Sequence, residues 1–286
     1  MSRRTLESRI EAALGVTPRR IGPLSGGCIG DVYAVDFDAN KRVVVKHDSS
    51  ADAKLDVEAF MLRYLAEHSN LPVPAVRFAA SDLLIMEFID GESLFSAKAE
   101  EHAADLLAAL HECRANEYGL DRDTLIGGLY QPNTKTSSWV TFFRDHRIMH
   151  MARLAHDERR IDTTMLGRIE SFAGRFEELL ADPPYPSLLH GDVWTTNVLA
   201  LDGRITGFID PAIYYGHPEI ELAFTTLFGT FGDTFFKRYH ERRPIADGFF
   251  DTRRDIYNCY PLLVHVRLFG SGYVSGINKV LMHYGC

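Results

Sequence analysis

Short apolar runs dominate the first ninety residues of the chain. DVYAVDF (31–37) and KRVVVKH (41–47) alternate or run apolar and are rich in β-branched residues, which is typical of strands joined in a hairpin. LPVPAVRF (71–78) is interpreted as an extended connector, because prolines punctuate it. LLIMEFIDG (83–91) is typical of a buried strand that ends in an Asp-Gly turn. The pattern predicts a small lobe rich in strands.

The segment 51–68 has the period of a helix instead. One face of it carries residues at helical spacing, namely Leu55, Glu58, Met61, Leu62 and Leu65. Glu58 is the charged member of this apolar face, and a carboxylate in such surroundings needs a partner.

Helical periodicity takes over from residue 92, and it runs through 99–113, 137–156, 163–182 and the stretch from Pro218 onward. Two short strands are predicted within it, at 198–203 and 205–210, on either side of a turn at Asp202-Gly203. We therefore expect an α+β fold of two lobes. The β-rich N-lobe covers 1–88, and the larger, mostly helical C-lobe covers 89–286.

Composition narrows the class of protein. The chain has 286 residues and a formal net charge of −8, which argues against nucleic acid or an anionic membrane as partner. The N-terminus lacks the apolar core of a secretory signal, and no apolar stretch is long enough to cross a bilayer. The four cysteines form no CxxC pair, so neither a zinc site nor a disulfide framework is indicated. We expect a reduced, cytoplasmic protein that is a monomer.

A glycine-rich turn precedes the predicted strand at 31–37. Its residues Gly26, Gly27, Cys28 and Gly30 would let backbone N–H groups approach phosphate oxygens, although an ordinary hairpin has the same composition. Lys46 ends the next strand. Paired with Glu58, it would hold its ammonium against two phosphates of ATP.

The segment LLHGDVWTTNVL (188–199) carries a further set of polar residues. Asp192 and Asn197 have the spacing of the catalytic loop H-x-D-x-x-x-x-N of protein kinases, and Asp210 ends the following strand. Asp192 would receive the proton of an acceptor hydroxyl. Asn197 and Asp210 would bind Mg²⁺, which prefers oxygen ligands.

Each of these residues alone could be a turn or a cap, but their order along the chain indicates a protein kinase-like fold. Two departures from the protein kinases are informative. Gly191 stands where they carry Arg, and Asp210-Pro211-Ala212 stands where they carry Asp-Phe-Gly. No segment that would receive an activation-loop phosphate is visible, so the sequence indicates a small-molecule kinase.

At this level of detail the chain resembles the fructosamine (ketosamine) 3-kinases, relatives of the aminoglycoside and choline kinases. Four segments carry the resemblance and together span nearly the whole chain: LLHGDVWTTNV, FIDPAIYYGHPEIELAFTTLFGTF, IGGLYQPNTKTSSWVTFFRDHRI and YPLLVHVRLFGSGY. The resemblance implies ATP-dependent phosphorylation of a sugar hydroxyl of ketosamines, with Mg²⁺ as the metal.

The resemblance also suggests which residues meet each ligand. Besides the glycine-rich loop and Lys46, the nucleotide is expected to contact Glu87, Phe88 and Ile89. The acceptor is expected near Asp192 and near Trp194, Gln131, Asn133, Tyr214 and Glu219. Trp194 could stack on a sugar face or fill the core. Glu219 and Glu221 could bind a cationic amine, orient the catalytic loop, or lie in a solvated helical turn.

Two rival functions stay open. An aminoglycoside or other aminoalcohol phosphotransferase would use the same chemistry on another acceptor. A non-catalytic nucleotide-binding module would have lost at least one of Lys46, Asp192, Asn197 and Asp210, and all four are present.

Cys28 adds a hypothesis about regulation. Backbone N–H groups and Lys46 would stabilise its thiolate, so oxidation could block ATP binding, or two molecules could cross-link through it. The alternative is a small apolar residue that fills the loop.

Overall fold

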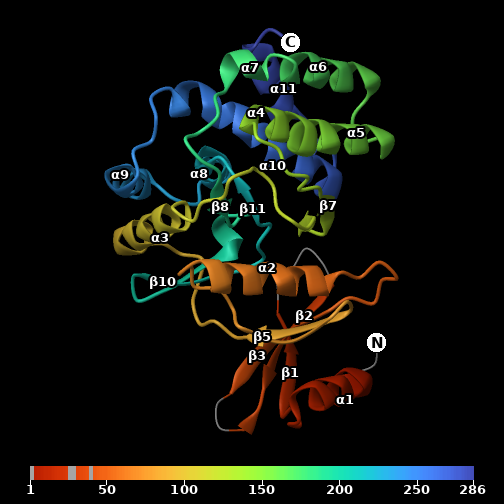
Figure 1. The fold of residues 1–286 in the computed structure, drawn as a ribbon. Helices are drawn as coiled ribbons and strands as arrows, with labels where there is room; N and C mark the ends of the chain where they lie inside the picture. Colours follow the sequence, from red (N-terminus) through yellow and green to blue (C-terminus); the bar gives the residue numbers. More distant parts are fainter. Residues whose placement is uncertain (1–2, 25–29, 39–40) are drawn as a thin grey trace.

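The chain folds into a small lobe built on one antiparallel sheet and a larger lobe made mostly of helices (Figure 1). The computed structural model describes residues 3–24, 30–38 and 41–286. Helix α2 lies between the sheet of the small lobe and the large lobe. The last strand of the sheet ends at Glu87, close to the expected end of the N-lobe.

The small lobe contains five strands in the order β1-β2-β3-β5-β4 and two helices. Every neighbouring pair of strands is antiparallel. In chain order the elements are α1 (Arg3–Leu14), β1 (Arg20–Pro23), β2 (Asp31–Asp36), β3 (Arg42–His47), α2 (Leu55–His68), β4 (Val76–Ala80) and β5 (Leu83–Glu87).

Strand alternation assigns each face of this sheet to one helix, because successive side chains of a strand point to opposite faces. Val43 and Val45 of β3 pack in one cluster with Leu6 and Ile10 of α1. On the other face, Leu84 and Met86 of β5 pack in a cluster with the apolar side of α2, and Val44 of β3 lies against it. Lys46 is two residues after Val44 on β3, so its side chain points to the same face of the sheet. That face is covered by α2, which carries Glu58.

The large lobe holds the remaining elements. They are α3 (Ala97–Leu110), β6 (Thr124–Ile126), β7 (Leu129–Gln131), α4 (Trp139–Phe142), η2 (Phe143–Met149), α5 (His150–Asp157), α6 (Thr163–Ala173), α7 (Phe176–Leu179), β8 (Ser187–Leu189), η3 (Thr195–Asn197), β9 (Val198–Leu201), β10 (Arg204–Phe208), β11 (Tyr214–Gly216), α8 (Pro218–Leu227), α9 (Asp233–Arg242), η4 (Phe249–Arg253), α10 (Arg254–Phe269), η5 (Ser271–Tyr273) and α11 (Val274–His283).

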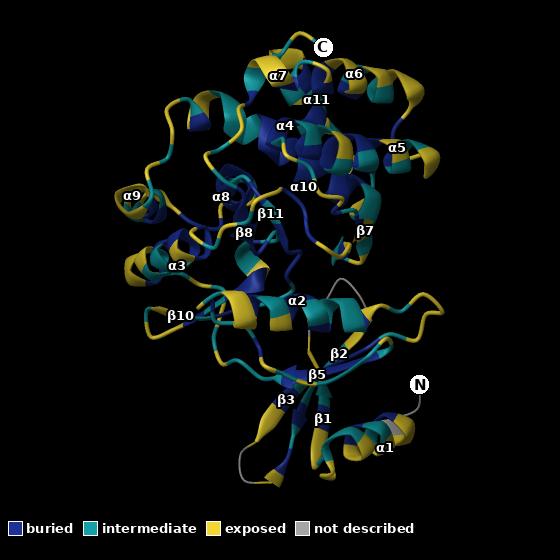
Figure 2. Ribbon diagram, in the orientation of Figure 1, coloured by how far each residue is buried: buried dark blue, intermediate teal, exposed yellow. Residues whose placement is uncertain are grey.

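Helix α10 forms the centre of this lobe (Figure 2). Its residues from Ile256 to Val266 are all buried, because α5, α8, α11 and η4 pack around it. Helix α8, which follows β11, packs on α10 and is buried over most of its length. Side chains near the end of α10, among them His265 and Phe269, line the cavity to which both lobes contribute.

Several predicted elements agree with the structure. The helix expected at 51–68 is α2, and the strands expected at 198–203 and 205–210 are β9 and β10. The turn between them places Asp202 and Gly203 at φ of 51° and 76°, as an Asp-Gly turn permits. Across the residues described, no helix combines the length and the apolar composition that a membrane crossing requires.

Other expectations were wrong. The connector at 71–78 runs into β4, because only its first half is proline-punctuated. The helix at 137–156 is interrupted by η2, which has π-helical hydrogen bonding from Phe143 to Met149. The hairpin of β6 and β7 and the pair of β8 and β11 have strands of three residues each, too short for a periodic signal.

Candidate active site

The expected catalytic loop joins β8 to β9 and is held beside the Asp-Pro-Ala segment. Strand β8 pairs with β11, and the N–H of Ala212 donates to the carbonyl of His190 at 2.7 Å. Gly191 has φ of 85°, and a Cβ at this position would overlap the carbonyl of Ala212. This close crossing explains why glycine stands where protein kinases carry arginine.

Asp192 and Asn197 meet within this loop. The side-chain amide of Asn197 donates to the Asp192 carboxylate at 2.9 Å and to the Asp192 backbone carbonyl at 3.0 Å. Burial raises the pKa of the Asp192 carboxyl well above its ordinary value, and the negative charge of Asp210 raises it further. The hydrogen bond from Asn197 acts in the opposite direction. A carboxylate of raised basicity is suited to receive a proton from a hydroxyl group.

Lys46 connects the two lobes. Its ammonium lies 2.8 Å from Glu58 of α2 and 2.5 Å from Asp210 of the large lobe. Burial opposes the charge on Lys46, but the two carboxylates outweigh it and hold its pKa above the usual value. The predicted pair with Glu58 is present, and Asp210 is a second partner that the pattern of the sequence did not indicate.

The oxygen donors expected to bind a metal lie on one side of this arrangement. The amide nitrogen of Asn197 is engaged with Asp192, so its oxygen is the group left to bind a cation. Asp210 has φ of 54°, a left-handed conformation that aspartate adopts more readily than most residues. A carboxylate and an amide oxygen fit Mg²⁺. Among the described residues no cluster of three His, Cys, Asp or Glu side chains is placed to hold a metal ion.

A cavity of about 210 Å³ opens above these residues. The small lobe contributes Lys46, Asp48, Asp52, Lys54, Leu55, Glu58 and Met61. The large lobe contributes Leu125, Ile126, Gly127, Gly128, Asp192, Trp194, Thr196, Asn197, Asp210, Pro211, Val264, His265, Leu268 and Phe269. The expected base and metal ligands therefore share one wall with Trp194, which lines the cavity and does not fill the core.

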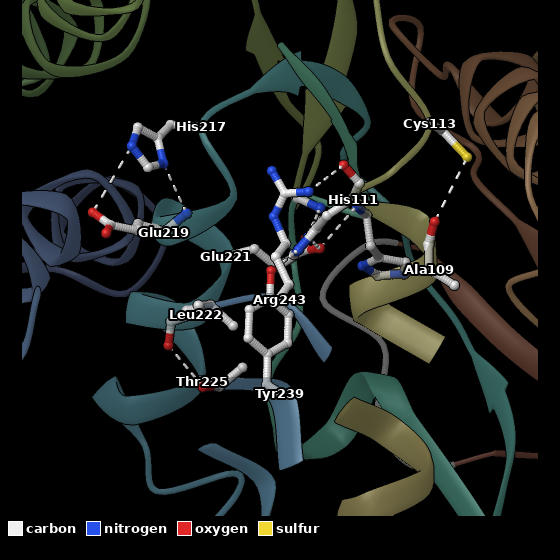
Figure 3. Close-up of polar contacts among 12 residues, drawn as sticks. Ala109, His111, Cys113, His217, Glu219, Glu221, Leu222, Thr225, Tyr239 and Arg243 are labelled. Carbon is white, nitrogen blue, oxygen red and sulfur yellow. Dashed lines mark hydrogen bonds and ion pairs between the residues drawn. The ribbon is translucent and has the colours of Figure 1, made fainter. Parts of the chain in front are cut away.

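A buried carboxylate anchors the catalytic loop from behind. Glu221 of α8 accepts hydrogen bonds from the N–H of Gly191 at 2.6 Å and from the N–H of His190 at 3.3 Å. Figure 3 shows Glu221 beside His111, which follows α3. The His111 imidazole donates from Nε2 to Glu221 at 2.9 Å, and its Nδ1 lies 2.6 Å from the hydroxyl of Tyr239. Of the roles open to Glu221, the contacts match orientation of the loop.

Glu219, on the same helix turn, has a different environment. Its carboxylate receives a bidentate ion pair from Arg253 at 2.6 and 2.7 Å and is 5% exposed. Its backbone N–H donates to His217, the N-cap of α8 (Figure 3). It does not line the cavity, so its expected contact with the acceptor is not supported.

Gln131, Asn133 and Tyr214 are also buried and lie outside the cavity wall. Gln131 donates to Thr124 and to the carbonyl of Ala212, and it accepts from Tyr260 at 2.6 Å. Asn133 accepts from the buried Arg147 at 2.7 Å, and the guanidinium of Arg147 lies 3.9 Å from the centre of the Tyr214 ring. These side chains brace the hairpin of β6 and β7, whose Gly127-Gly128 turn does line the cavity.

The residues expected to contact the nucleotide are only partly described. Gly26, Gly27 and Cys28 lie outside the described residues. Gly30 has φ of 67°, and a Cβ there would come within 2.6 Å of the carbonyl of His47, so glycine lets β2 start beside β3. Glu87 is paired with Arg77, and Phe88 lies 4.9 Å from the guanidinium of Arg42. Ile89 packs against Gly207. None of these three lines the cavity described above.

Sequence reasoning missed His111 and His265. His111 belongs to the segment 99–113, whose apolar residues recur at helical spacing. Such spacing predicts which face of the helix is buried, but it does not indicate that a buried histidine there binds a distant carboxylate. His265 lies in the part of α10 that is buried on all sides, from Ile256 to Val266, so no amphipathic period marks the face that it occupies.

Comparisons with known proteins concern the chain as a whole. The family model for fructosamine kinase matches residues 3–284. A probable ketoamine kinase of Vibrio parahaemolyticus is 34% identical over 272 residues, which cover 91% of this chain and 92% of the relative. The chloroplastic protein-ribulosamine 3-kinase of Arabidopsis thaliana is 31% identical over 276 residues, which cover 93% of this chain and 82% of the relative.

Solved structures show the same relationship in three dimensions. A protein from Thermobifida fusca, assigned as a fructosamine-3-kinase, superposes with a TM-score of 0.88 and 29% identity over 98% of both chains. The aminoglycoside phosphotransferase APH(4)-Ia, bound to ADP and hygromycin B, superposes with a TM-score of 0.65 and 18% identity over 96% of this chain and 92% of its own. At that identity the second likeness concerns the fold alone.

Proposed function

This chain belongs to the fructosamine kinase family, and we propose that the protein is an ATP-dependent kinase that phosphorylates a sugar hydroxyl of ketosamines. Ketosamines are the products of the reaction of a sugar such as glucose or ribose with an amine. Relatives that carry the names ketoamine kinase and protein-ribulosamine 3-kinase support this acceptor class.

One observation carries the proposal. Lys46, Asp192, Asn197 and Asp210 come from distant parts of the chain and line a single cavity. All four make direct side-chain contacts, in two pairs: Lys46 with Asp210, and Asn197 with Asp192.

Each of these side chains has a proposed task. Asp192 accepts the proton of the attacking hydroxyl at its carboxylate, and Asn197 holds that carboxylate in place. Lys46 binds phosphate oxygens of the nucleotide and is oriented by Glu58. Glu221 fixes the loop that presents Asp192. Phosphoryl transfer depends mostly on such positioning and on charge, and little covalent chemistry is left to the protein.

Asn197 and Asp210 are the proposed ligands of Mg²⁺. The metal, when bound with ATP, neutralises charge on the phosphates and helps to hold them in line with the acceptor. We also propose that Trp194, at the cavity wall beside Asp192, packs against the sugar ring.

An aminoglycoside acceptor is not favoured. The likeness to the aminoglycoside phosphotransferase is confined to the fold, whereas the family model and the named relatives concern ketosamines.

We further propose a cytoplasmic location and a monomer. The three cysteines among the described residues, Cys113, Cys259 and Cys286, are free thiols, which is in keeping with a reducing compartment.

The decisive experiment follows consumption of ATP by the purified protein with ribulosamine, fructosamine and aminoglycoside acceptors, each with and without Mg²⁺. We expect turnover only with the ketosamines and only with the metal. Phosphorylation of the aminoglycosides alone would replace the proposed acceptor class, and no turnover with any acceptor would reject the kinase itself.

A further inference from the structure

His265 is a nearly buried polar side chain at the wall of the active-site cavity. It belongs to the YPLLVHVRLFGSGY segment, it is 6% exposed, and it lines the cavity together with Trp194 and Phe269. Its Nδ1 lies 2.7 Å from the carbonyl of Pro261, one helical turn earlier. Because a carbonyl can only accept, Nδ1 carries the proton.

The other ring nitrogen, Nε2, has no hydrogen-bond partner among the described residues. Burial lowers the pKa of the imidazole, so at neutral pH the ring is uncharged and Nε2 presents a lone pair. Among the described residues, Nε2 of His265 is not one of the unpaired polar atoms that are sealed in the core, so its lone pair is accessible from the cavity that His265 lines.

Aromatic rings lie around the His265 imidazole, and two of them, Trp194 and Phe269, line the cavity with it. The ring centres of Phe228, Tyr273 and Phe269 lie 4.9, 5.0 and 5.3 Å from that of His265, and Trp194 lies at 6.1 Å. Phe228 and Phe269 are 37% and 52% exposed, which is unusual for phenylalanine beside a buried core. Exposed ring faces next to a hydrogen-bond acceptor are the surroundings that bind an organic cation.

The charges of the cavity favour the same ligand. Glu58 and Asp210 form ion pairs with Lys46, and Asp192 accepts a hydrogen bond from Asn197. The remaining charged side chains of the wall are Asp48, Asp52 and Lys54 from the small lobe. Two carboxylates against one ammonium leave the cavity wall as a whole with an excess of negative charge.

We propose that His265 and the rings around it form a subsite for the protonated amine nitrogen of the acceptor. The ammonium N–H donates to Nε2 of His265, and the cation lies against the face of Phe269. This inference rests on the proposed function, because a ketosamine carries one secondary amine next to its sugar. It assigns to α10 the recognition of the nitrogen, while Asp192 meets the hydroxyl group.

Two substitutions of His265 separate the roles of its nitrogens. In His265→Asn the side-chain amide occupies the place of Nδ1 and can still donate to Pro261, but the acceptor at the place of Nε2 is gone. In His265→Gln the side-chain amide reaches the place of Nε2 and can present its oxygen there. The surface variant His283→Asn, in the last turn of α11, is the matched control for a histidine-to-asparagine change.

Two acceptors probe the nitrogen. One is a ketosamine of a simple alkylamine, and the other is its N-acetyl derivative, which has the same sugar but a neutral nitrogen without N–H. For wild type we expect a KM for the amine about tenfold or more below that for the amide, the range of one hydrogen bond to a charged group. His265→Asn should raise the KM for the amine by about the same factor with kcat nearly unchanged, whereas His265→Gln should stay within about threefold of wild type.

A second variant tests the aromatic part at an exposed position, where loss of folding is not a concern. Phe269→Leu keeps the apolar surface and removes the ring. We expect the KM for the amine to rise about two- to fivefold and the KM for the amide to stay constant. Phe269→Tyr keeps the ring and should behave as wild type.

The outcomes distinguish the two proposals. If wild type phosphorylates no ketosamine, the proposed function fails, and this subsite fails with it. If wild type is active but His265→Asn and Phe269→Leu leave the KM for the amine unchanged, only the subsite is overturned. Equal increases of KM for the amine and the amide would also overturn it, since His265 would then act on the shape of the cavity and not on the cation.

Discussion

Glu221 accepts a 2.6 Å hydrogen bond from the backbone N–H of Gly191, so a helix of the large lobe holds the catalytic loop by its main chain. The carboxylate is 2% exposed and is supported in turn by His111. Burial alone would raise its pKa, but the hydrogen bonds and charge of its histidine and backbone partners outweigh this and keep the pKa of Glu221 below its usual value. The loop is therefore tied to a carboxylate that stays ionised.

Replacement of this carboxylate by an amide tests whether its hydrogen bond to Gly191 positions the loop. In Glu221→Gln the Gly191 N–H keeps an acceptor but loses the charge, so we expect kcat to fall about tenfold and the free energy of unfolding to fall by about 1.5–3 kcal/mol. Glu219→Gln is the matched control, since Glu219 binds Arg253 and touches no residue of the loop. It should reduce stability and spare kcat. Equal kcat in the two variants would show that Glu221 does not position the loop.

Gly191 is expected to tolerate no side chain. In Gly191→Ala the new Cβ would meet the carbonyl of Ala212, and φ of 85° would add strain of about 1–3 kcal/mol. We expect a loss of kcat of at least about a hundredfold, measured in a coupled ATPase assay alongside thermal unfolding. Gly167→Ala, in α6 with nothing near its Cβ, should instead stabilise the protein by about 0.5–1 kcal/mol. An active Gly191→Ala enzyme would disprove the tight crossing.

Asp192→Asn should abolish turnover and preserve nucleotide binding. The substitution keeps the size of the side chain and removes its ability to take a proton, a function worth about 10²–10⁴ in rate. Steady-state kinetics and calorimetry with ATP measure the two properties separately. Turnover within about threefold of wild type would exclude Asp192 as the base, against the factor expected for such a group.

The basicity of Asp192 should depend on Asp210. In the metal-free protein we expect the Asp192 carboxyl to titrate above about 3.9, the ordinary value for aspartate, because burial and the charge of Asp210 both disfavour ionisation. Asp210→Asn removes that charge and should shift the titration to lower pH. Carbon-13 NMR of labelled aspartate carboxyls measures both values. A raised pKa makes the base form appear only as pH increases, so activity limited by Asp192 is lost as pH falls through that value. An unshifted titration in Asp210→Asn would mean that burial acts alone.

Asp210→Ala should remove the dependence of ATP binding on Mg²⁺, because the metal would bridge this carboxylate to the phosphates. Calorimetry with and without the metal compares the variant with wild type. The same dependence in both proteins would reduce Asp210 to a partner of Lys46.

The features that the sequence predicted well are those in which a period and a spacing agree. Lys46 and Glu58 could be paired because strand alternation puts Lys46 on one face of the sheet and helical spacing puts Glu58 on the apolar face of the next helix. Asp192 and Asn197 lie within one short loop, so their spacing along the chain almost determines their contact in space.

The residues that were misjudged are polar side chains whose direction depends on tertiary packing. Gln131 ends a strand of three residues and Asn133 lies just beyond it. The local sequence does not indicate whether these two buried side chains face the cavity or the hairpin behind it. Glu219 and Glu221 are two positions apart on one helix, yet one meets Arg253 and the other meets the catalytic loop. That difference arises because Arg253 of η4 lies beside Glu219, whereas His111 and Gly191 lie beside Glu221, and no local pattern records these tertiary contacts.

The position of Lys46 between Glu58 and Asp210 has a thermodynamic consequence for nucleotide capture. The Lys46 ammonium has two anionic neighbours, one on each lobe. On the proposed roles of these residues, a phosphate that bound Lys46 would compete with Asp210 for the ammonium, and Asp210 would become available to a divalent ion as Lys46 turned to the phosphate. Nucleotide and metal should then bind cooperatively, because each would raise the affinity of the enzyme for the other. The affinity for either ligand alone should be low.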